Sequence, residues 1–524
     1  MSTDLETLAS RAGELFLLAF AGSDPAPAQQ MIRNYHLSGL YLSNDNIPDT
    51  SSARALTKAV QETARDSGEA FPLLLGVDQE GTWSVMATDS HPGPGNLALG
   101  AAGDPELTHA RYRDLALELR QNGLNLLLAP CADVNTNPHN AIIGMRSFGT
   151  HPEAVGKHVA AAVQGARSGG ALSTIKHFPG HGDTLVDSHR DLPTVSRSRE
   201  DVWDIDLAPF RCGIEAGVDL VMTSHICFDA LDPDTPATFS RKILHDLLRK
   251  EMGFSGLVIS DSMNMHSLRK HFDPVEAAVR AISAGVDLIM LAEEHYDHDG
   301  AYQTRQRQLI EGLAAEIRKG RIPEARLEEA LNRIQAVRKS LSSATPDTSA
   351  DFAQSAIQAA RQALRVHHQN PRWRSPQPGA TVRLIRSSPD SAFLAATQTR
   401  GIGPNPQCSA FDALHKALEP HFSVHLQPPF AAVSQEDPVV LVLENYTLPG
   451  ADFDRSRDPE VIRWAQSLDP AQVTVIALRD AFELVETHPL TTLCAYSFRE
   501  ESAEQAALWL AGQVPEVRKG GAFG

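Results

Sequence analysis

The residues best suited to acid–base chemistry lie in one short stretch, 176–189, which reads KHFPGHGDTLVDSH. It contains three histidines, two aspartates and one lysine, and its proline and glycines permit the sharp bends of a loop. Asp187 stands two residues before His189. A carboxylate that accepts the imidazole N–H would fix the tautomer of His189 and stabilise its cation. This pair could therefore act as a general acid or base near neutral pH.

The same stretch offers ligands for a metal ion, since five of its residues carry suitable donor atoms: His177, His181, Asp183, Asp187 and His189. It lacks HExxH and CxxC spacings, and the cationic Lys176 within it would repel a metal ion. We therefore expect no metal and no organic cofactor. A structural loop of hydrogen-bonded histidines would explain any one of these residues, but not the whole cluster.

Three further residues stand where apolar runs give way to polar ones. Asp261 follows the run 256–259 and could be a nucleophile, a general base, an ion-pair partner or the cap of the next helix. Asp78 follows the run 72–77, and Arg146 lies on a later loop. An aspartate and an arginine at a polar site suit the hydroxyl groups of a sugar, but either could instead form a buried salt bridge.

Short apolar runs rich in Leu, Val and Ile recur through the first part of the chain, as is typical of strands buried on both faces. They lie at 15–20, 37–42, 72–77, 124–129, 171–175, 220–223, 256–259 and 288–291. Helical periodicity separates several of them, at 105–122, 154–168 and 274–284. This alternation predicts an α/β fold, a (β/α)₈ TIM-type barrel. Ionisable residues end five runs, and the carboxyl ends of barrel strands form the active-site face: Asp78, Lys176 with His177, His225, Asp261 and Glu293.

A second, smaller domain is predicted after the barrel. A helical stretch, 308–341, is followed by the small, polar segment 342–350, which is typical of a linker. The expected organisation is thus a barrel over 1–341, a linker over 342–350 and a C-terminal domain over 351–524. Expected helices (352–366, 411–418, 459–467, 503–512) interleave with expected strands (382–385, 423–426, 439–443, 473–478, 493–497). That pattern predicts a doubly wound α/β sandwich.

Composition excludes several classes of protein. Lys and Arg total 47 against 65 Asp and Glu, a net charge of -18, and no basic stripe for nucleic acid is present. The five cysteines form no CxxC pair, which fits a reducing compartment. The early apolar run follows acidic residues rather than a basic segment, and no run approaches the length of a membrane span. We expect a cytoplasmic protein without membrane contact, and the oligomeric state stays open.

The 176–189 motif closely resembles the signature of the bacterial β-N-acetylglucosaminidases of glycoside hydrolase family 3. Further segments resemble that family in the same order along the chain: RSFGTHPEAV (146–155), LAPFRCGIEAGVDLVMTSHICFDALD (207–232), PATFSRKILHDLLRKEMGFSGLVISDSMNM (236–265) and EAAVRAISAGVDLIML (276–291). The resemblance covers residues 12–340. The C-terminal domain is similar to the family's second α/β domain, though with fewer matching segments.

This resemblance implies a retaining mechanism with a covalent glycosyl-enzyme intermediate. Asp261 matches the nucleophile, His189 the acid/base of this branch, and Asp187 its dyad partner. The positions that hold the sugar's hydroxyl groups are matched by Asp78, Arg146, Lys176 and His177. The implied activity is that of an exo-β-N-acetylglucosaminidase acting on cell-wall or chitin-derived saccharides, muropeptides included.

The chain departs from the family directly after Asp78. The family usually continues with a Gly-Gly-Arg-Val run and a further arginine, whereas this chain reads GTWSVM over 81–86. A β-hexosidase of different sugar preference therefore stays open. A phosphorylase also stays open, because a histidine base repels phosphate less than a carboxylate would. A non-enzymatic carbohydrate-binding protein is the third alternative, which the presence of Asp261, Asp187 and His189 disfavours.

Overall fold

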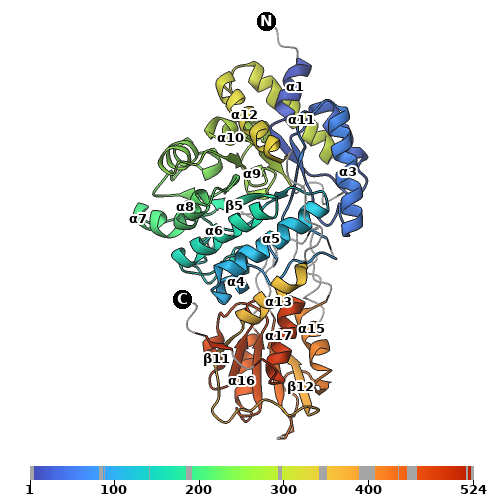
Figure 1. Ribbon diagram of the computed structural model, residues 1–524. Coiled ribbons are helices and arrows are strands. Elements are labelled where there is room, and N and C mark those ends of the chain that lie inside the picture. Colours follow the sequence, from blue (N-terminus) through green and yellow to red (C-terminus); the bar gives the residue numbers. More distant parts are fainter. Residues whose placement is uncertain are drawn as a thin grey trace.

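The computed structural model describes residues 5–81, 86–87, 89–140, 142–184, 192–292, 298–341, 351–388, 408–434, 436–444, 457–514 and 517–520. In these ranges the chain forms a helix-wrapped barrel followed by a smaller sheet domain, drawn in orange and red in Figure 1. Each part has its own large cluster of buried apolar side chains.

The described strands of the barrel are all parallel, in the order β10-β1-β2-β3-β4-β5-β7-β9. A parallel bridge between Ile259 and Leu288 and a hydrogen bond from Ser260 N to the Leu288 carbonyl join the last strand to the first, which closes the barrel. The strands are β1 (Phe16–Leu18), β2 (Gly39–Tyr41), β3 (Leu74–Val77), β4 (Leu126–Leu127), β5 (Leu172–Phe178), β7 (Leu220–Thr223), β9 (Leu257–Ile259) and β10 (Ile289–Leu291).

Helices surround this sheet on the outside. They are α1 (Leu5–Gly13), α2 (Ala26–Tyr35), α3 (Thr50–Asp66), α4 (Asn96–Ala102), α5 (Pro105–Gln121), α6 (Pro152–Ser168), α8 (Ala208–Glu215), a π-type helix at Lys242–Glu251, α9 (His266–Arg269), α10 (Pro274–Ala284), α11 (Tyr302–Arg318) and α12 (Glu324–Ser340). Two of them begin at an Asp-Pro pair. Asp104 and Asp273 accept backbone N–H groups of the first turns of α5 and α10, and the following proline has the φ that a first helical turn needs.

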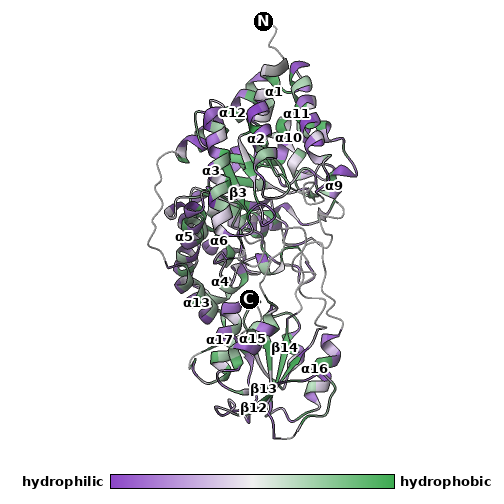
Figure 2. Cartoon of the chain, turned by 90° about the vertical axis from the view of Figure 1, so that its right-hand side faces the viewer, coloured by the Kyte–Doolittle hydropathy of each residue, from purple (hydrophilic) through white to green (hydrophobic). Residues whose placement is uncertain are grey.

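The C-terminal sheet is mixed, with strand order β13-β12-β14-β15-β16-β11-β17. β12 to β16 run parallel in a doubly wound arrangement, and β11 pairs antiparallel with β16. The strands are β11 (Arg365–His368), β12 (Thr381–Arg386), β13 (Ser423–Leu426), β14 (Val439–Leu443), β15 (Val473–Ala477), β16 (Thr491–Cys494) and β17 (Arg518–Lys519). The helices include α13 (Phe352–Ala363), α15 (Ala410–Leu418), α16 (Asp458–Gln466) and α17 (Glu500–Leu510). Figure 2 shows hydrophobic residues on β3 and β14 inside the two parts and hydrophilic residues on the helices outside.

The two parts share a packed junction. Leu97 and Ala98 of α4, together with Met145, belong to the same buried apolar cluster as the C-terminal sheet. Arg499 Nε donates to the carbonyl oxygen of Gly81 at 2.6 Å, and Arg111 Nη1 donates to the carbonyl of Phe352 at 2.7 Å. The second domain therefore touches the turn that directly follows β3.

The predicted fold class is confirmed, a (β/α)₈ barrel followed by a smaller α/β domain. Two element predictions are corrected. The helical stretch 308–341 is interrupted between α11 and α12, because Pro323 lacks the N–H that a continuous helix would use there. The predicted helix 352–366 ends at Ala363, since Arg365 and Val366 pair with β16 and β17. The predicted linker, 342–350, lies outside the described residues.

Across the described ranges, no helix combines the length and the apolar character needed to cross a membrane.

Candidate active site

A buried lysine joins the ends of two barrel strands. The Lys176 Nζ atom, on β5, lies 2.6 Å from Asp78 Oδ1 and 2.6 Å from Glu80 Oε1, which both follow β3. The hydroxyl of Tyr41, at the end of β2, donates to Asp78 Oδ2 at 3.0 Å. Burial alone would lower the pKa of Lys176, but Asp78 and Glu80 raise it above the ordinary value, so the ammonium group stays charged.

Glu80 also binds an arginine. Arg146 forms two parallel hydrogen bonds to it, from Nε to Oε2 and from Nη2 to Oε1, each at 2.9 Å. The Glu80 side chain is fully buried. Burial opposes its ionisation, but Arg146 and Lys176 outweigh that effect and lower the pKa of Glu80 to about 2. Arg146 thus forms the buried salt bridge that the sequence left open as an alternative.

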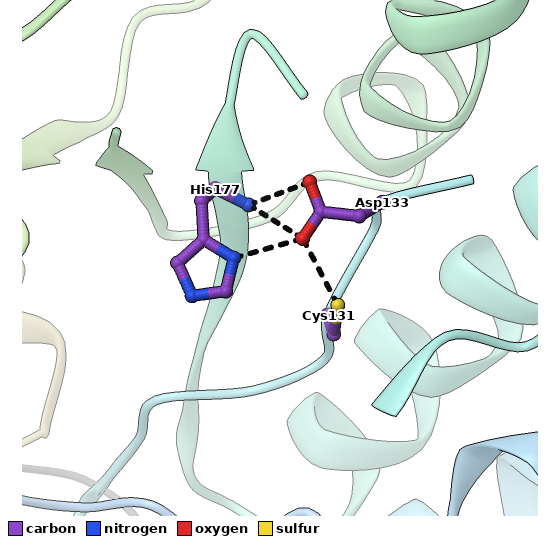
Figure 3. A group of neighbouring side chains, drawn as sticks. All are labelled: Cys131, Asp133 and His177. Carbon is purple, nitrogen blue, oxygen red and sulfur yellow. Dashed lines mark hydrogen bonds and ion pairs between the residues drawn. The ribbon is translucent and has the colours of Figure 1, made fainter. Parts of the chain in front are cut away.

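His177 lies between this cluster and a second buried carboxylate. Its Nδ1 is 2.8 Å from Asp133 Oδ2 (Figure 3). Its Nε2 is 3.3 Å from Arg146 Nη2. A proton on Nδ1 satisfies both contacts, because the guanidinium can then donate to Nε2. Asp133 is fully buried and also accepts from the His177 backbone N–H and from Cys131 Sγ at 3.1 Å. The ring of His177 is therefore fixed in orientation and tautomer.

Cys131, Asp133 and His177 place one potential metal-ligand atom each within 4.8 Å of one another. Hydrogen bonds among the three already use these atoms, as the dashed lines in Figure 3 show. Burial raises the pKa of the Cys131 thiol well above its usual range, so the thiol keeps its proton and donates a hydrogen bond to Asp133. Arg146 on the other side of His177 adds positive charge. This chemistry fits a hydrogen-bonded network rather than a cation site.

The segment 181–184 leads from this network toward the predicted acid/base loop. His181 N–H donates to Asp133 Oδ1 at 2.7 Å, and its Nδ1 contacts Thr184 Oγ1 at 2.7 Å. Asn140 Nδ2 donates to the His181 carbonyl at 2.8 Å. At position 182 only glycine fits, because a Cβ atom there would overlap the carbonyl oxygen of Val134. Burial, with the nearby His177, lowers the pKa of His181 to about 4, so this ring is neutral at pH 7.

The two residues predicted to move the proton, Asp187 and His189, lie outside the described residues. Two other residues also lie outside the described ranges: Trp83, in the segment 81–86 where the chain departs from the family, and Glu293, which follows the last apolar run.

Asp261 is the second residue after β9, in a turn braced from both neighbouring strands. Its Oδ1 accepts the Ser262 N–H at 2.7 Å. His225, two residues after β7, contacts the Ser262 carbonyl through Nε2 at 3.1 Å. On the other side, Ala292 N–H after β10 donates to Ser262 Oγ at 3.0 Å. The carboxylate is half-buried, which leaves it accessible at the carboxyl end of the barrel.

The structure brings four predicted residues into one chain of contacts: Asp78, Lys176, Arg146 and His177. Asp261 lies on the same barrel face, separated from β5 by β7 in the strand order. Two residues of the network were not predicted as site residues, Glu80 and Asp133. Both had a signal, because each stands within four residues of the end of an apolar run, where the carboxyl face of the barrel is expected.

Comparison with known proteins gives matches to one family of glycosidases. Residues 7–337 match the family described as the glycosyl hydrolase family 3 N-terminal domain. Beta-hexosaminidase A of Pseudoalteromonas piscicida is 35% identical over 285 residues, which are 51% of this chain and 48% of that protein. The chain thus aligns with about half the length of that relative. A beta-hexosaminidase of Stenotrophomonas maltophilia is 31% identical over 304 residues, 56% of this chain and 88% of that protein.

Among solved structures, a glycoside hydrolase family 3 beta-N-acetylglucosaminidase from Paenibacillus sp. FPU-7 superposes with a TM-score of 0.82 at 28% sequence identity. The match covers 98% of each chain, so it includes the C-terminal domain as well as the barrel.

Proposed function

The chain belongs to glycosyl hydrolase family 3, and on that premise we propose that it is a retaining exo-β-N-acetylglucosaminidase. It removes β-linked N-acetylglucosamine from the ends of cell-wall or chitin-derived saccharides. The relatives from Pseudoalteromonas and Stenotrophomonas are named beta-hexosaminidases, and the Paenibacillus structure is that of a beta-N-acetylglucosaminidase.

The observation that carries the proposal is the polar network at the carboxyl ends of the barrel strands, with Asp261 on the same face. A monosaccharide presents several hydroxyl groups that must each donate or accept. Asp78 and Lys176 offer a paired acceptor and donor at 2.6 Å, and the fixed ring of His177 adds another polar group. Since the hydrogen bonds and ion pairs of this network already fix its side chains, it can orient a sugar without reorganising.

Asp261 is the proposed nucleophile. In the first step a carboxylate oxygen of Asp261 bonds to the anomeric carbon, and the bond from that carbon to the leaving oxygen breaks. The leaving oxygen takes a proton from His189, whose cation is stabilised by Asp187. In the second step neutral His189 removes a proton from water, the water oxygen bonds to the anomeric carbon, and Asp261 is released. Each substitution inverts the configuration of the anomeric carbon, so two substitutions retain it.

The contacts of Asp261 support this assignment. The Ser262 N–H donates to Oδ1 and so fixes the orientation of the carboxylate. The turn cannot shift independently of the barrel, because His225 and Ala292 anchor Ser262 from two other strand ends. The segment 181–184, before the acid/base loop, is fixed in the same way. His181 forms hydrogen bonds with Asp133, Asn140 and Thr184.

Hydrolysis of an aryl β-N-acetylglucosaminide beside the matching β-glucoside, each with and without phosphate, tests the proposal. We expect strong preference for the N-acetyl sugar and rates that do not depend on phosphate. Release of a sugar 1-phosphate would identify a phosphorylase instead, and activity on the glucoside alone would identify a β-hexosidase of different preference. Asp261→Ala should abolish turnover while the circular dichroism spectrum stays native, and wild-type rates in that variant would exclude Asp261 as the nucleophile.

A further inference from the structure

Two stretches that resemble the family meet next to the turn that carries Asp261: TSH at 223–225, at the end of β7, and PATFS at 236–240, which contains a short 3₁₀ helix. The Thr238 N–H donates to the Ser224 carbonyl oxygen at 3.2 Å, which holds the two stretches side by side. Their polar side chains are buried, with exposed fractions of 1% or less for His225 and Thr238. Buried polar groups of this kind depend on one another for hydrogen bonds.

The ring of His225 connects these stretches to the nucleophile turn. Its Nε2 lies 3.1 Å from the carbonyl oxygen of Ser262. A carbonyl oxygen can only accept a hydrogen bond, so this contact requires a proton on Nε2. The N–H of the same serine donates to Asp261 Oδ1 at 2.7 Å. The imidazole therefore holds the residue that orients the carboxylate.

The contacts of the other ring nitrogen favour an acceptor at that position. Nδ1 of His225 lies 2.8 Å from Thr238 Oγ1, which is also 2.8 Å from Thr223 Oγ1 and 2.9 Å from the Ser224 carbonyl oxygen. The Thr238 hydroxyl has one proton to donate. Because the Ser224 carbonyl already accepts the Thr238 N–H, that proton can go to Nδ1 while the hydroxyl accepts from Thr223. The result is a directed chain of hydrogen bonds from the Thr223 hydroxyl to the Ser262 carbonyl.

A neutral imidazole fits these contacts better than a cation. Both ring nitrogens of His225 contact uncharged oxygen atoms, and burial disfavours the charged form of a histidine. With the proton on Nε2, the neutral ring accepts from Thr238 and donates to Ser262. With the proton on Nδ1, two acceptors would face each other, the Nε2 lone pair and the Ser262 carbonyl oxygen. The environment thus selects one tautomer.

The nucleophile turn is held differently on its other side. The backbone N–H groups of Met290 and Ala292, in and after β10, donate to the hydroxyl oxygens of Ser260 and Ser262 at 3.1 and 3.0 Å. These two serines flank Asp261 directly. The contacts from β10 thus come from the main chain, whereas the contact from the β7 side comes from a ring whose protonation can change. Its strength depends on the residue at position 225 and on the location of its proton.

We propose that His225, as a neutral imidazole with its proton on Nε2, is a positioning residue for the nucleophile, and that Thr238 fixes this tautomer. The ring acts through Ser262 and keeps the Asp261 carboxylate where it can reach the anomeric carbon. The inference rests on the proposed function for the role of Asp261. A displaced carboxylate should slow the attack on every substrate, whatever its leaving group.

The kinetics of variants of the full chain test this with two aryl β-N-acetylglucosaminides, one with a good leaving group and one with a poor one. His225→Asn loses the donor at the Nε2 position and should lower kcat/KM by about 10²-fold for both substrates. The inhibition constant of the product N-acetylglucosamine, which reports binding of the sugar, should not change. His225→Gln can place an amide N–H where Nε2 lies and should restore most of the activity.

Two kinetic results would overturn the role of His225. One is a wild-type kcat/KM in His225→Asn. The other is a loss confined to the substrate with the poor leaving group, which would mean that the histidine acts through the acid/base residue instead of the nucleophile.

A matched pair of variants separates positioning from a general loss of stability. Thr108 on α5 also contacts a buried histidine, His158 on α6, with 2.7 Å between Oγ1 and Nδ1. Thr108→Val and Thr238→Val therefore each remove a buried threonine–histidine hydrogen bond, and their unfolding midpoints in urea should fall by similar amounts. The Thr238→Val variant alone should lose kcat/KM, by about tenfold, the effect of one hydrogen bond. Thr238→Ser should restore it, and equal kcat/KM values in the two valine variants would overturn the role of Thr238.

The protonation state of His225 can be measured without any substrate. In a ¹⁵N NMR spectrum of the chain with labelled histidine, the signals that disappear in His225→Gln should be those of a neutral ring protonated on Nε2 at pH 7. A cationic ring, or a proton on Nδ1, would overturn the proposal. If the unmodified chain fails to cleave the aryl N-acetylglucosaminides, the proposed function falls, while this spectrum still decides the state of the ring.

Discussion

Replacing Glu80 by Gln would remove one charge from the centre of the site while keeping the shape of the side chain. Glu80 is fully buried and holds two cations, Arg146 at 2.9 Å and Lys176 at 2.6 Å. Asp78 still pairs with Lys176 in the variant, but Arg146 loses the charge of the carboxylate to which it donates two hydrogen bonds. We therefore expect Glu80→Gln to destabilise the barrel and to disorder the residues that orient the substrate.

The size of the effect follows from the pKa of Glu80. Its pKa falls from the ordinary 4.5 to about 2, and each pKa unit corresponds to 1.36 kcal/mol, so the ionised form contributes about 3 kcal/mol to folding. Removing one partner of a buried ion pair generally costs about 3–5 kcal/mol, which agrees. A displaced Lys176 or Arg146 should lower kcat/KM by roughly 10²-fold as well, because small misplacements of positioning groups have effects of that order.

The assay is unfolding in urea, monitored by circular dichroism at several pH values between 3 and 7. Because the folded pKa is depressed, the stabilisation from Glu80 is fully present above 4.5 and is lost as the pH falls toward 2. The gap in unfolding free energy between the two proteins should thus be widest at pH 6–7 and narrow below pH 4.5. The aryl glycoside gives kcat/KM in parallel.

Glu153→Gln is the matched control, since Glu153 forms an ion pair with Lys157 but is 85% exposed. Exposed pairs of this kind contribute little, so no measurable change is expected. Two results would refute the argument that the Glu80 carboxylate stabilises the fold through its charge. One is a free energy of unfolding for Glu80→Gln equal to that of the control. The other is a difference in this free energy between Glu80→Gln and the wild type that does not depend on pH.

Three other outcomes are expected. His189→Ala should slow the cleavage of oligosaccharides by about 10²–10⁴-fold and aryl glycosides with good leaving groups much less; equal losses in kcat/KM would mean that it only positions the sugar. Burial raises the pKa of Asp206 to about 7, so between about pH 4 and pH 7 the folded state holds a proton that the unfolded state releases. The free energy of unfolding should therefore fall as the pH rises from about 4 to 7. In urea unfolding, Asp206→Asn should lack this dependence on pH. Incubation with a chelator should leave the rate of hydrolysis unchanged, because Cys131 and Asp133, two of the potential metal ligands, are already hydrogen-bonded to each other. Loss of activity that zinc restores would contradict this.

The barrel could be predicted from the sequence because its strands are buried on both faces. Such strands read as apolar runs, and the residues that follow them must lie at the carboxyl face. Asp78 and Asp261 were found in this way. By contrast, the end of α13 was misplaced, because Arg365 and Val366 become a strand only through pairing with β16 and β17, more than 120 residues away in the chain.

The pairing inside the site could not be predicted in the same way. Arg146 was recognised as a candidate, but its partner Glu80 lies 66 residues away, and only the closed barrel brings them together. A local signal for Glu80 did exist. Glu80 is the second residue after Asp78, and side chains two positions apart in an extended segment point to the same side. Gln79 between them points elsewhere, where its Oε1 accepts the Met86 N–H at 2.6 Å.

The contacts at the domain junction imply that the second domain supports the site. Arg499 donates to the Gly81 carbonyl, one residue after Glu80, so the charged anchor of the network is followed directly by a contact with the other domain. Leu97 and Met145 belong to the apolar cluster of the C-terminal sheet, and Met145 precedes Arg146. Both partners of the Glu80–Arg146 pair are thus flanked by residues that the second domain holds. Because a buried ion pair is stable only when its geometry is maintained, the packing of the second domain is one of the conditions for the network at the strand ends.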